Sequence, residues 1–259
     1  MAKRELDGQA AIVTGAAHGF GRQICLQLGR LGARIAACDI NAGELADTKN
    51  LLEAEGASVI AIPVDVTDEV QVQEFVDHVI GEWGQIDILV NDAGGTLGIG
   101  FAPVDQVATA DWDRIVKVNL YGSFFFTRAV AGHMKRRRYG KIVNISSGAG
   151  RSHSRTGVQA YTAAKAGVLG LTRQCAQELG PYNVNVNSVA PGLIMSTPGG
   201  QKQWADRPPE EKQETLATVA LRRLGGVEDI ANAVCYLVTS AGGWVTGQTI
   251  AVDGGHWMF

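Results

Sequence analysis

A tyrosine and a lysine four residues apart, Tyr161 and Lys165, are the residues of this sequence best suited to move a proton. The surrounding segment 159–179 is rich in Ala, Leu and Gln and has no internal proline, which predicts a helix. Because four residues make about one helical turn, both side chains would lie on one face. An ammonium group beside a phenol favours the phenolate, so proton transfer would come closer to neutral pH. The same spacing also occurs by chance on solvated helices, and the rest of the chain has to decide between the two interpretations.

A glycine-rich turn follows the first apolar segment. Residues 10–14 predict a buried strand, and the residues up to Leu31 have the amphipathic pattern of a helix. Between them lie the glycines of a G-x-x-x-G-x-G motif, Gly15, Gly19 and Gly21. Amide groups at a helix N-terminus favour a pyrophosphate, and glycines let a ligand approach the backbone. The motif therefore predicts a dinucleotide site, although its spacing would also suit an ordinary turn.

An acid ends the second predicted strand, 34–39. Asp39 lies about 20 residues after the glycines, where a carboxylate accepts hydrogen bonds from the adenosine ribose and would repel the 2′-phosphate of NADP. Neither His18 nor Ile40 provides a fixed positive charge there. The sequence therefore predicts NAD as the cofactor. Asp39 is also a candidate N-cap for the next helix, a role for which Asn41 is equally suited.

Strand-like and helix-like segments alternate along the chain, which predicts a parallel sheet with right-handed crossovers. The expected strands are 10–14, 34–39, 58–63, 86–90, 141–145, 183–189 and 248–252. The later expected helices are 68–81, 111–137, 159–179 and 227–238. A polar segment with several prolines, about 193–217, predicts a mobile lid. No repeat or linker interrupts the pattern, so a single domain over 1–259 is expected.

Composition and charge exclude several classes of protein. The chain has 259 residues, 46% hydrophobic and 19% charged, with a net charge of −3, so a nucleic-acid partner is not expected. No apolar run approaches about 18 residues, and the N-terminus is charged, so neither a membrane span nor a signal peptide is expected. The four cysteines form no CxxC or Cys/His cluster, which argues against a metal site. A cytoplasmic location is the resulting prediction.

The motifs occur together in an order that resembles the short-chain dehydrogenase/reductase family. They are Thr14-Gly-x-x-x-Gly-x-Gly21, Asn91-Asp-Ala-Gly94, Asn119, Ser147, Tyr161-x-x-x-Lys165 and Pro191-Gly192. The resemblance runs from about Leu6 to Gly255. It implies a Rossmann-like, doubly wound α/β fold with seven parallel strands, helices on both faces and the cofactor at the carboxyl ends of the strands. It also implies hydride transfer between a nicotinamide and a secondary alcohol or ketone.

The resemblance assigns a role to each matching position. Tyr161 would be the general acid/base, and Lys165 would lower its pKa and hold the nicotinamide ribose. Ser147 would bind the substrate oxygen, and Asn119 would anchor a water in the proton relay. The residues expected to bind NAD are Gly15, Gly19, Phe20, Gly21, Asp39, Asp65, Val66, Asn91, Ala93, Gly94, Tyr161, Lys165, Pro191, Gly192, Ile194 and Ser196.

Three positions depart from the family pattern. Asp92 stands where a second asparagine is usual, and the shared turn chemistry of Asp and Asn predicts an unchanged loop. The interval from the serine to the tyrosine is one residue longer than usual, so Ser146 is an alternative to Ser147 as the hydroxyl that binds substrate. Ser196 stands where a threonine often binds the nicotinamide amide, and Thr197 beside it is an alternative.

Two other functions fit the same motifs: a catalytically silent NAD-binding regulator, and an NAD-using epimerase or dehydratase. A silent module has no physical need for all four polar residues of the predicted catalytic set. The family's epimerases and dehydratases generally have a larger substrate domain, for which the predicted lid leaves little room. An NAD-dependent alcohol dehydrogenase or ketone reductase is therefore the favoured prediction.

The loop between Ser147 and Tyr161 carries an unusual set of basic side chains, Arg151, His153 and Arg155. Because this loop joins two predicted catalytic groups, it must border the substrate pocket. Arginine recognises carboxylate or phosphate through paired donors, which predicts an anionic substrate. The alternative is that the arginines face solvent or pair with an acid of a neighbouring subunit.

The sequence ends in an apolar tail, Trp257-Met-Phe259. Exposed aromatic groups are unfavourable and tend to mark contacts. Since members of the family are commonly tetramers, we expect a homotetramer with this tail at or near an interface. Packing of the tail on its own protomer is the alternative.

Overall fold

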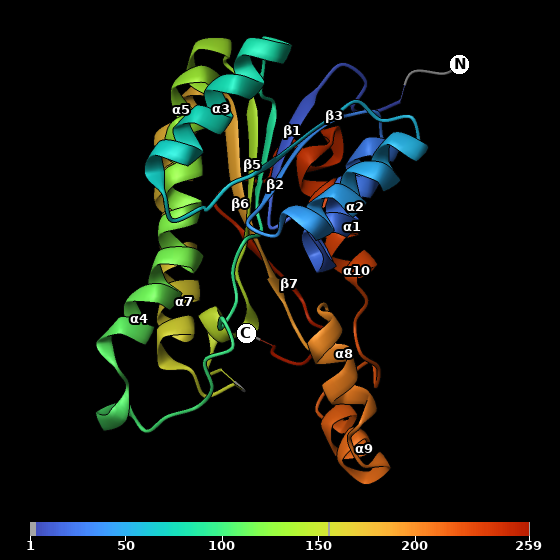
Figure 1. Ribbon diagram of the computed structural model, residues 1–259, viewed down its shortest axis with the longest axis vertical. Coiled ribbons are helices and arrows are strands. Elements are labelled where there is room, and N and C mark those ends of the chain that lie inside the picture. Colours follow the sequence, from blue (N-terminus) through green and yellow to red (C-terminus); the bar gives the residue numbers. More distant parts are fainter. Residues whose placement is uncertain (1–3, 155, 259) are drawn as a thin grey trace.

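The computed structural model describes residues 4–154 and 156–258 (Figure 1). Within these residues, a sheet of seven strands has the order β3-β2-β1-β4-β5-β6-β7, and neighbouring strands run parallel. The strands are β1 (Ala10–Thr14), β2 (Arg34–Asp39), β3 (Val59–Pro63), β4 (Ile88–Asn91), β5 (Gly140–Ile145), β6 (Val184–Pro191) and β7 (Thr249–Val252). This sheet confirms the predicted Rossmann-like, doubly wound α/β fold.

The order of the strands reverses between β1 and β4. The chain first moves outward from β1 through β2 to β3, and then crosses back to place β4 on the other side of β1. Ligands of doubly wound sheets bind at the carboxyl ends of the strands at such a reversal. The glycine turn that follows Thr14 and the loop that follows Asn91 therefore lie side by side at the expected binding edge.

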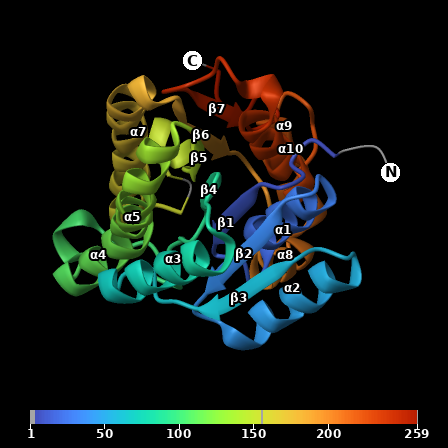
Figure 2. The ribbon, with the colours of Figure 1, turned by 90° about the horizontal axis from the view of Figure 1, so that it is seen from above.

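Helices cover both faces of the sheet (Figure 2). One face carries α1 (Gly19–Arg30), α2 (Ala42–Ala54) and α10 (Val227–Val238), and the other carries α3 (Glu69–Trp83), α5 (Gly122–Arg137) and α7 (Gln159–Leu179). Because side chains alternate along a strand, Val13 packs with Ile24 on the first face, whereas Ile12 packs with Phe126 on the second. Burial of both faces explains the nearly continuous apolar strands of the sequence.

The predicted helix 111–137 is interrupted. The structure has α4 (Thr109–Val116), a π-helical turn (Lys117–Tyr121) and then α5. Asn119 lies in the π turn, and its amide donates to Ile115 O at 2.9 Å and to Gly95 O at 2.8 Å. The expectation of one regular helix is wrong at this turn, because the side chain takes over a backbone acceptor that the regular pattern would use.

Short helices form in two segments expected to be loops. The segment between Ser147 and Tyr161 contains α6 (Gly148–Arg151), and the segment 193–217 contains α8 (Pro198–Ala205) and α9 (Pro209–Ala217). Side chains cap the first two: Ser147 Oγ accepts from Ala149 N at 3.1 Å, and Thr197 Oγ1 accepts from Gly200 N at 3.1 Å. Helices α8 and α9 extend beyond the carboxyl end of the sheet (Figure 1).

The remaining described elements are brief. They are 3₁₀ helices at Val104–Gln106, Gly180–Tyr182 and Ser240–Gly242. Among the helices of the described ranges, none combines the length and the apolar character that crossing a membrane would require.

Helix α6 lies directly on the backbone of α7. A Cβ atom added to Gly150 would come within 2.6 Å of Lys165 O and 2.8 Å of Ser146 Oγ. Only a residue without a side chain allows this approach, which brings the serine pair that precedes α6 close to the Tyr161 turn of α7. The packing of α6 on α7 thus brings Ser147 close to Tyr161 and Lys165.

We expect Gly150→Ala to destabilise the protein by about 1–3 kcal/mol, because the methyl group would push α6 away from rigid backbone atoms. The matched control is Gly81→Ala in α3, where an added Cβ meets no atom within 4 Å. This control should be neutral or stabilising by up to about 1 kcal/mol. Urea unfolding of both variants measures the difference, and equal effects would contradict the close packing of α6 on α7.

Candidate active site

A cavity of about 460 Å³ opens at the carboxyl ends of β1 and β4. Predicted cofactor residues that line it are Gly15, Gly19, Phe20, Asp39, Asp65, Val66, Ala93, Gly94, Tyr161, Lys165 and Ser196. Its other lining residues are His18, Ile40, Val64, Asp92, Gly95, Leu97, Val118, Ile145, Ser146 and Thr197. The structure therefore brings both ends of the sequence-predicted site, the glycine turn and the Tyr–Lys pair, into one cavity.

The other predicted cofactor residues do not line this cavity. Gly21 lies against Gly15 in the first turn of α1. Asn91 is buried, and its amide donates to Asn144 Oδ1 at 2.8 Å, which joins the ends of β4 and β5. Pro191 ends β6, and Gly192, the next residue, packs tightly on Asp253. Ile194 lines a neighbouring cavity of about 490 Å³ together with residues of the β7 end.

Two glycines allow a close approach of backbone segments around the cavity. Gly15 has φ +69°, and a Cβ there would lie 2.8 Å from Ala93 N. Gly19 has φ +59°, and a Cβ there would lie 2.8 Å from Ser196 O. Thr14 Oγ1 fastens the loop after β4 by accepting hydrogen bonds from Asp92 N and Ala93 N, each at 3.0 Å. Both glycines are therefore required by left-handed backbone and by contact with neighbouring backbone atoms.

The N-terminus of α1 at this turn is suited to an anion. Its first turn carries no acidic residue, and the side chain of its N-cap residue, His18, makes no capping hydrogen bond. The helix dipole and the first amide groups therefore favour negative charge at this end of the cavity. This local chemistry fits the pyrophosphate of a dinucleotide.

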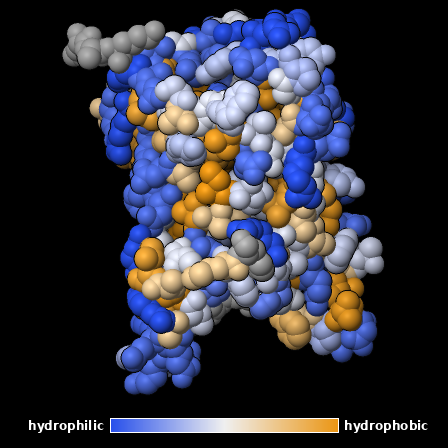
Figure 3. Space-filling model, turned by 180° about the vertical axis from the view of Figure 1, so that it is seen from behind, coloured by the Kyte–Doolittle hydropathy of each residue, from blue (hydrophilic) through white to orange (hydrophobic). Residues whose placement is uncertain are grey.

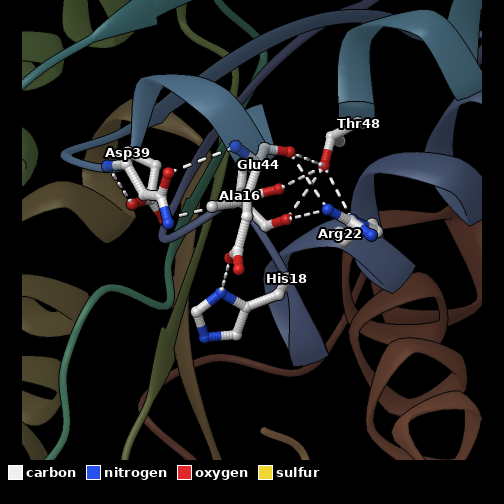
Figure 4. A network of polar contacts seen from close by, with 8 residues as sticks. Ala16, His18, Arg22, Asp39, Glu44 and Thr48 are labelled. Carbon is white, nitrogen blue, oxygen red and sulfur yellow. Dashed lines mark hydrogen bonds and ion pairs between the residues drawn. The ribbon is translucent and has the colours of Figure 1, made fainter. Parts of the chain in front are cut away.

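The carboxylate of Asp39 is held against the glycine turn (Figure 4). Its Oδ2 accepts from Ala17 N at 3.1 Å, and its Oδ1 accepts from Asn41 N at 2.9 Å. The N-cap of α2 is Asn41, whose Oδ1 accepts from Glu44 N at 3.2 Å. Of the two N-cap candidates that the sequence offered, Asp39 and Asn41, the structure uses Asn41. Asp39 lines the cavity.

Tyr161 and Lys165 lie one turn apart on α7, as their spacing predicts. Lys165 is 4% exposed, and its Nζ donates to Ile145 O at 2.8 Å and lies 5.8 Å from the centre of the Tyr161 ring. A Cβ on Gly94 would lie 3.1 Å from this Nζ. The ammonium group is thus held in a confined space between the ends of β4 and β5.

The structure distinguishes the two serines that the sequence left open. Ser146 is buried, and its Oγ donates to Lys165 O at 2.9 Å, so this hydroxyl fastens β5 to α7. The hydroxyl of Ser147 interacts with the Tyr161 phenol and lowers the pKa of that phenol. Ser147 is therefore the serine whose hydroxyl adjoins the phenol.

Burial controls the charges around this pair. Burial raises the pKa of the Tyr161 phenol, the Ser147 hydrogen bond opposes this shift, and the charge of Asp92 adds to it. The Tyr–Lys spacing predicted the opposite direction; desolvation of the phenol exceeds the stabilising contacts in this structure. The same effect lowers the pKa of Lys165 to about 8, against the attraction of Asp92.

Asp92 is a departure from the family pattern with electrostatic consequences. Burial raises the pKa of its carboxyl to about 7, although Lys165 and a hydrogen bond from the Gly21 amide favour the charged form. The shared turn chemistry of Asp and Asn predicted that the loop would be unchanged. The loop is formed as expected, but the carboxylate places a titratable group next to the amino group of Lys165.

Asn119 holds the loop after β4. Its Oδ1 accepts from Gly95 N at 2.9 Å and its amide donates to Gly95 O, and the side chain is fully buried. These paired bonds hold the loop in which Gly94 lies beside Lys165. The structure therefore shows Asn119 organising the site, while its predicted water remains a prediction.

The predicted substrate residues are only partly gathered. Arg151 ends α6, and the exposed ring of His153 packs edge-on against Trp257, with ring centres 5.0 Å apart. Arg155 lies outside the described residues. Trp257 also packs against Gly148, so the C-terminal tail contacts, within its own protomer, the segment between Ser147 and Tyr161. The apolar character of the tail was visible in the sequence, but its contact with this loop was not.

A metal centre is not formed by the residues described. Their His, Cys, Asp and Glu side chains do not gather in groups of three or more that would hold an ion.

Known proteins are similar to this chain in sequence and in fold. The family model described as short chain dehydrogenase matches residues 9–208. The chain is 38% identical over 254 residues to (2S)-((R)-hydroxy(phenyl)methyl)succinyl-CoA dehydrogenase subunit BbsD of Thauera aromatica, covering 98% of both chains. It is 38% identical to 3-oxoacyl-(acyl-carrier-protein) reductase FabG of Thermotoga maritima, covering 96% of this chain and 98% of that one.

This protein belongs to the short-chain dehydrogenase family.

A solved structure of this family supports the architecture of the site. The structure of 7 alpha-hydroxysteroid dehydrogenase, complexed with NADH and 7-oxo glycochenodeoxycholic acid, has a TM-score of 0.88 and 34% identity, and covers 97% of this chain and 95% of that one. Proteins of the short-chain dehydrogenase family are oxidoreductases that use a nicotinamide cofactor. The glycine cradle, the α1 N-terminus and Asp39 are compatible with such a dinucleotide in this member.

We expect Asp92→Asn to stabilise the protein at neutral pH. An aspartate of an unfolded chain ionises near pH 3.9, whereas Asp92 in the fold ionises near 7. The folded wild type therefore binds this proton more tightly, and its stability falls as pH rises from about 4 to about 7. The asparagine variant lacks this loss. Its stability relative to the wild type should therefore grow over the same pH range by about 1 kcal/mol or more, since one pKa unit corresponds to about 1.4 kcal/mol.

Urea unfolding at about pH 5 and about pH 7.5 measures this change. Asp105→Asn, at an exposed position, is the matched control and should show no such growth with pH. A variant at position 92 that behaves like this control would contradict the burial of the Asp92 charge.

Proposed function

We propose that this protein is an NAD-dependent dehydrogenase or reductase that transfers a hydride between a secondary alcohol or ketone and the nicotinamide. The observation that carries this proposal is that Tyr161 and Lys165 line the same cavity as Asp39 and the glycine turn. Ser147 interacts with the Tyr161 phenol. A single cavity thus joins a proton-transfer group to a dinucleotide-binding turn. The proposed unit is one catalytic domain over 1–259, with 193–217 as its lid.

The side chains would divide the work as follows. Tyr161 gives a proton to the substrate oxygen during reduction and takes it back during oxidation. Ser147, already within hydrogen-bonding reach of the phenol, orients the same oxygen. Lys165 provides a positive charge and donors for the nicotinamide ribose. Asn119 keeps the loop after β4 in place and is proposed to hold a water of the proton relay. The cofactor supplies the hydride chemistry.

NAD rather than NADP is the proposed cofactor. Both carboxylate oxygens of Asp39 are held by backbone amides, so the charge has a fixed position at the adenosine end of the cavity. A ribose diol can donate to this carboxylate, whereas a 2′-phosphate would meet a like charge in close contact. The exposed side chain next to it, Ile40, brings no compensating charge.

An anionic substrate is the proposed specificity. Arg151 is the last residue of α6, the short helix that Ser147 caps. The names of two similar proteins point the same way, because one acts on a succinyl-CoA derivative and one is bound to a cholic acid derivative. Paired guanidinium donors would recognise a carboxylate or phosphate of the substrate.

A homotetramer in the cytoplasm is the proposed form of the protein. The π turn and α5 expose Tyr121 and Phe124, which are 46% and 42% accessible, and Trp112 of α4 is 37% accessible. Hydrophobic residues also gather across the middle of the face seen in Figure 3. Apolar surface of this kind is favourable to bury between copies of the chain. Met258, which is 76% exposed, is available for such a contact next to the tail's own packing on its protomer.

Tyr161→Phe should lower turnover by about 10²–10⁴-fold, because only the proton-carrying oxygen is removed. NADH production with a panel of secondary alcohols measures turnover, and NADH binding should persist. The matched control is Tyr182→Phe at an exposed tyrosine outside the cavity, which should keep full activity. Wild-type turnover in the Tyr161 variant would refute this mechanism.

The wild type should have a higher kcat/KM with NAD than with NADP, and Asp39→Ala should narrow the difference. Removing the carboxylate removes the repulsion of a 2′-phosphate, worth about tenfold for each 1.4 kcal/mol. Initial rates with both cofactors measure the ratio. Equal efficiency with both cofactors in the wild type would contradict the proposed choice of NAD.

Light scattering of the purified protein should give the mass of four chains, each of 27.4 kDa. Tyr121→Glu combined with Phe124→Glu should reduce this mass, because charges are costly in an apolar interface. Far-UV circular dichroism checks that the variant remains folded. A monomeric wild type would refute the tetramer.

A further inference from the structure

The adenosine end of the cavity contains an ion pair that the glycine motif and Asp39 do not explain. His18 lines the cavity immediately before α1, and its Nδ1 lies 2.6 Å from Oε2 of Glu44 in α2 (Figure 4). Both side chains are partly exposed, at 42% and 41%. An ion pair with this exposure contributes little to folding stability, so stability does not account for its presence.

The backbone around this pair is held firmly. Glu44 N donates to Asn41 Oδ1 at 3.2 Å, and Glu44 O accepts from Arg22 Nη2 at 3.0 Å. Arg22 Nε also donates to Thr48 Oγ1 at 2.8 Å. These contacts join the first turn of α2 to α1, so Glu44 keeps its position beside the glycine turn.

The same contacts engage the guanidinium of Arg22, a permanent cation of α1. The Arg22 guanidinium bonds to Ala17 O, Glu44 O and Thr48 Oγ1, all of them on the protein side of the turn. Glu44 of α2 contacts His18 directly, and the charge of Asp92 after β4 interacts with it. The other titratable side chains that line the cavity are Asp39, Asp65, Tyr161 and Lys165. His18 is thus a potential cation surrounded mostly by acids.

The charge of His18 bears on the 2′-phosphate of a bound dinucleotide. A protonated imidazole at this position would be a donor for a 2′-phosphate, the group that distinguishes NADP from NAD. The bond to Glu44 occupies one of its two nitrogens, and the carboxylate cancels its charge. A carboxylate beside Asp39 would also repel the phosphate directly.

We propose that Glu44 is a second selectivity residue of the cofactor site, which holds His18 in an ion pair and so prevents it from binding a 2′-phosphate. The inference rests on the proposed use of NAD. Asp39 excludes the phosphate by its own charge, and Glu44 removes the cation that would attract it. Selectivity would then depend on two acids from different elements, β2 and α2.

Direct binding of NADH and NADPH tests this role without any need for turnover. Dissociation constants are measured by nicotinamide fluorescence at fixed ionic strength, at about pH 6 and about pH 8. The variants are Glu44→Gln, His18→Gln with Glu44→Gln, and Glu53→Gln. Glu53 is exposed on the same helix, so its substitution changes the net charge of α2 equally without touching the cofactor site.

We expect Glu44→Gln to bind NADPH about 5–10-fold more tightly than the wild type at about pH 6, where a histidine is largely protonated, and to gain less at about pH 8. NADH binding should change by less than about twofold. The double variant should lose the pH-dependent part of the gain, and Glu53→Gln should match the wild type.

Equal NADPH binding by Glu44→Gln and Glu53→Gln would overturn the role of Glu44, and so would a gain that persists in the double variant at low pH. These outcomes differ from a failure of the proposed function. A wild type that binds NADPH more tightly than NADH would refute the choice of NAD, and an absence of turnover would refute the reaction while leaving the binding ratios measurable.

Discussion

The close approach of backbone segments at the carboxyl ends of the strands is the constraint on which this site depends. Gly15 brings the turn after β1 against the loop after β4, and Gly19 brings the start of α1 under the segment that follows β6. Gly150 brings α6 onto α7 in the same way. Because a Cβ at any of these positions would meet backbone atoms, the cavity, the helix N-terminus and the reacting groups keep their mutual positions.

This compactness also determines the electrostatics. The loop after β4 and the end of β5 enclose the amino group of Lys165, and the carboxyl of Asp92 lies in the same confined region. Loss of water raises the pKa of Asp92 to about 7 and lowers that of Lys165 to about 8. The groups around Tyr161 therefore change charge near neutral pH, which is the range that acid–base chemistry needs.

Membership in the short-chain dehydrogenase family accounts for the sheet and for the order of the motifs. It does not account for several individual contacts of this chain. The asparagine expected after Asn91 is an acid here, the ring of Trp257 packs on His153 in the loop before α7, and a His18–Glu44 pair lies beside the glycine turn. Each of these features joins segments that are distant in the sequence.

The sequence by itself determined the alternation of elements, the glycine turn and the spacing of Tyr161 and Lys165, because these are periodic or local patterns that a short segment expresses alone. Only the tertiary structure decided which serine adjoins the phenol, since Ser146 is engaged by the backbone of α7. Tertiary contacts also determine the π turn at Asn119 and the raised pKa of the Tyr161 phenol. Those outcomes depend on which groups meet and how much water they lose, and neither is encoded in the spacing of residues along one segment.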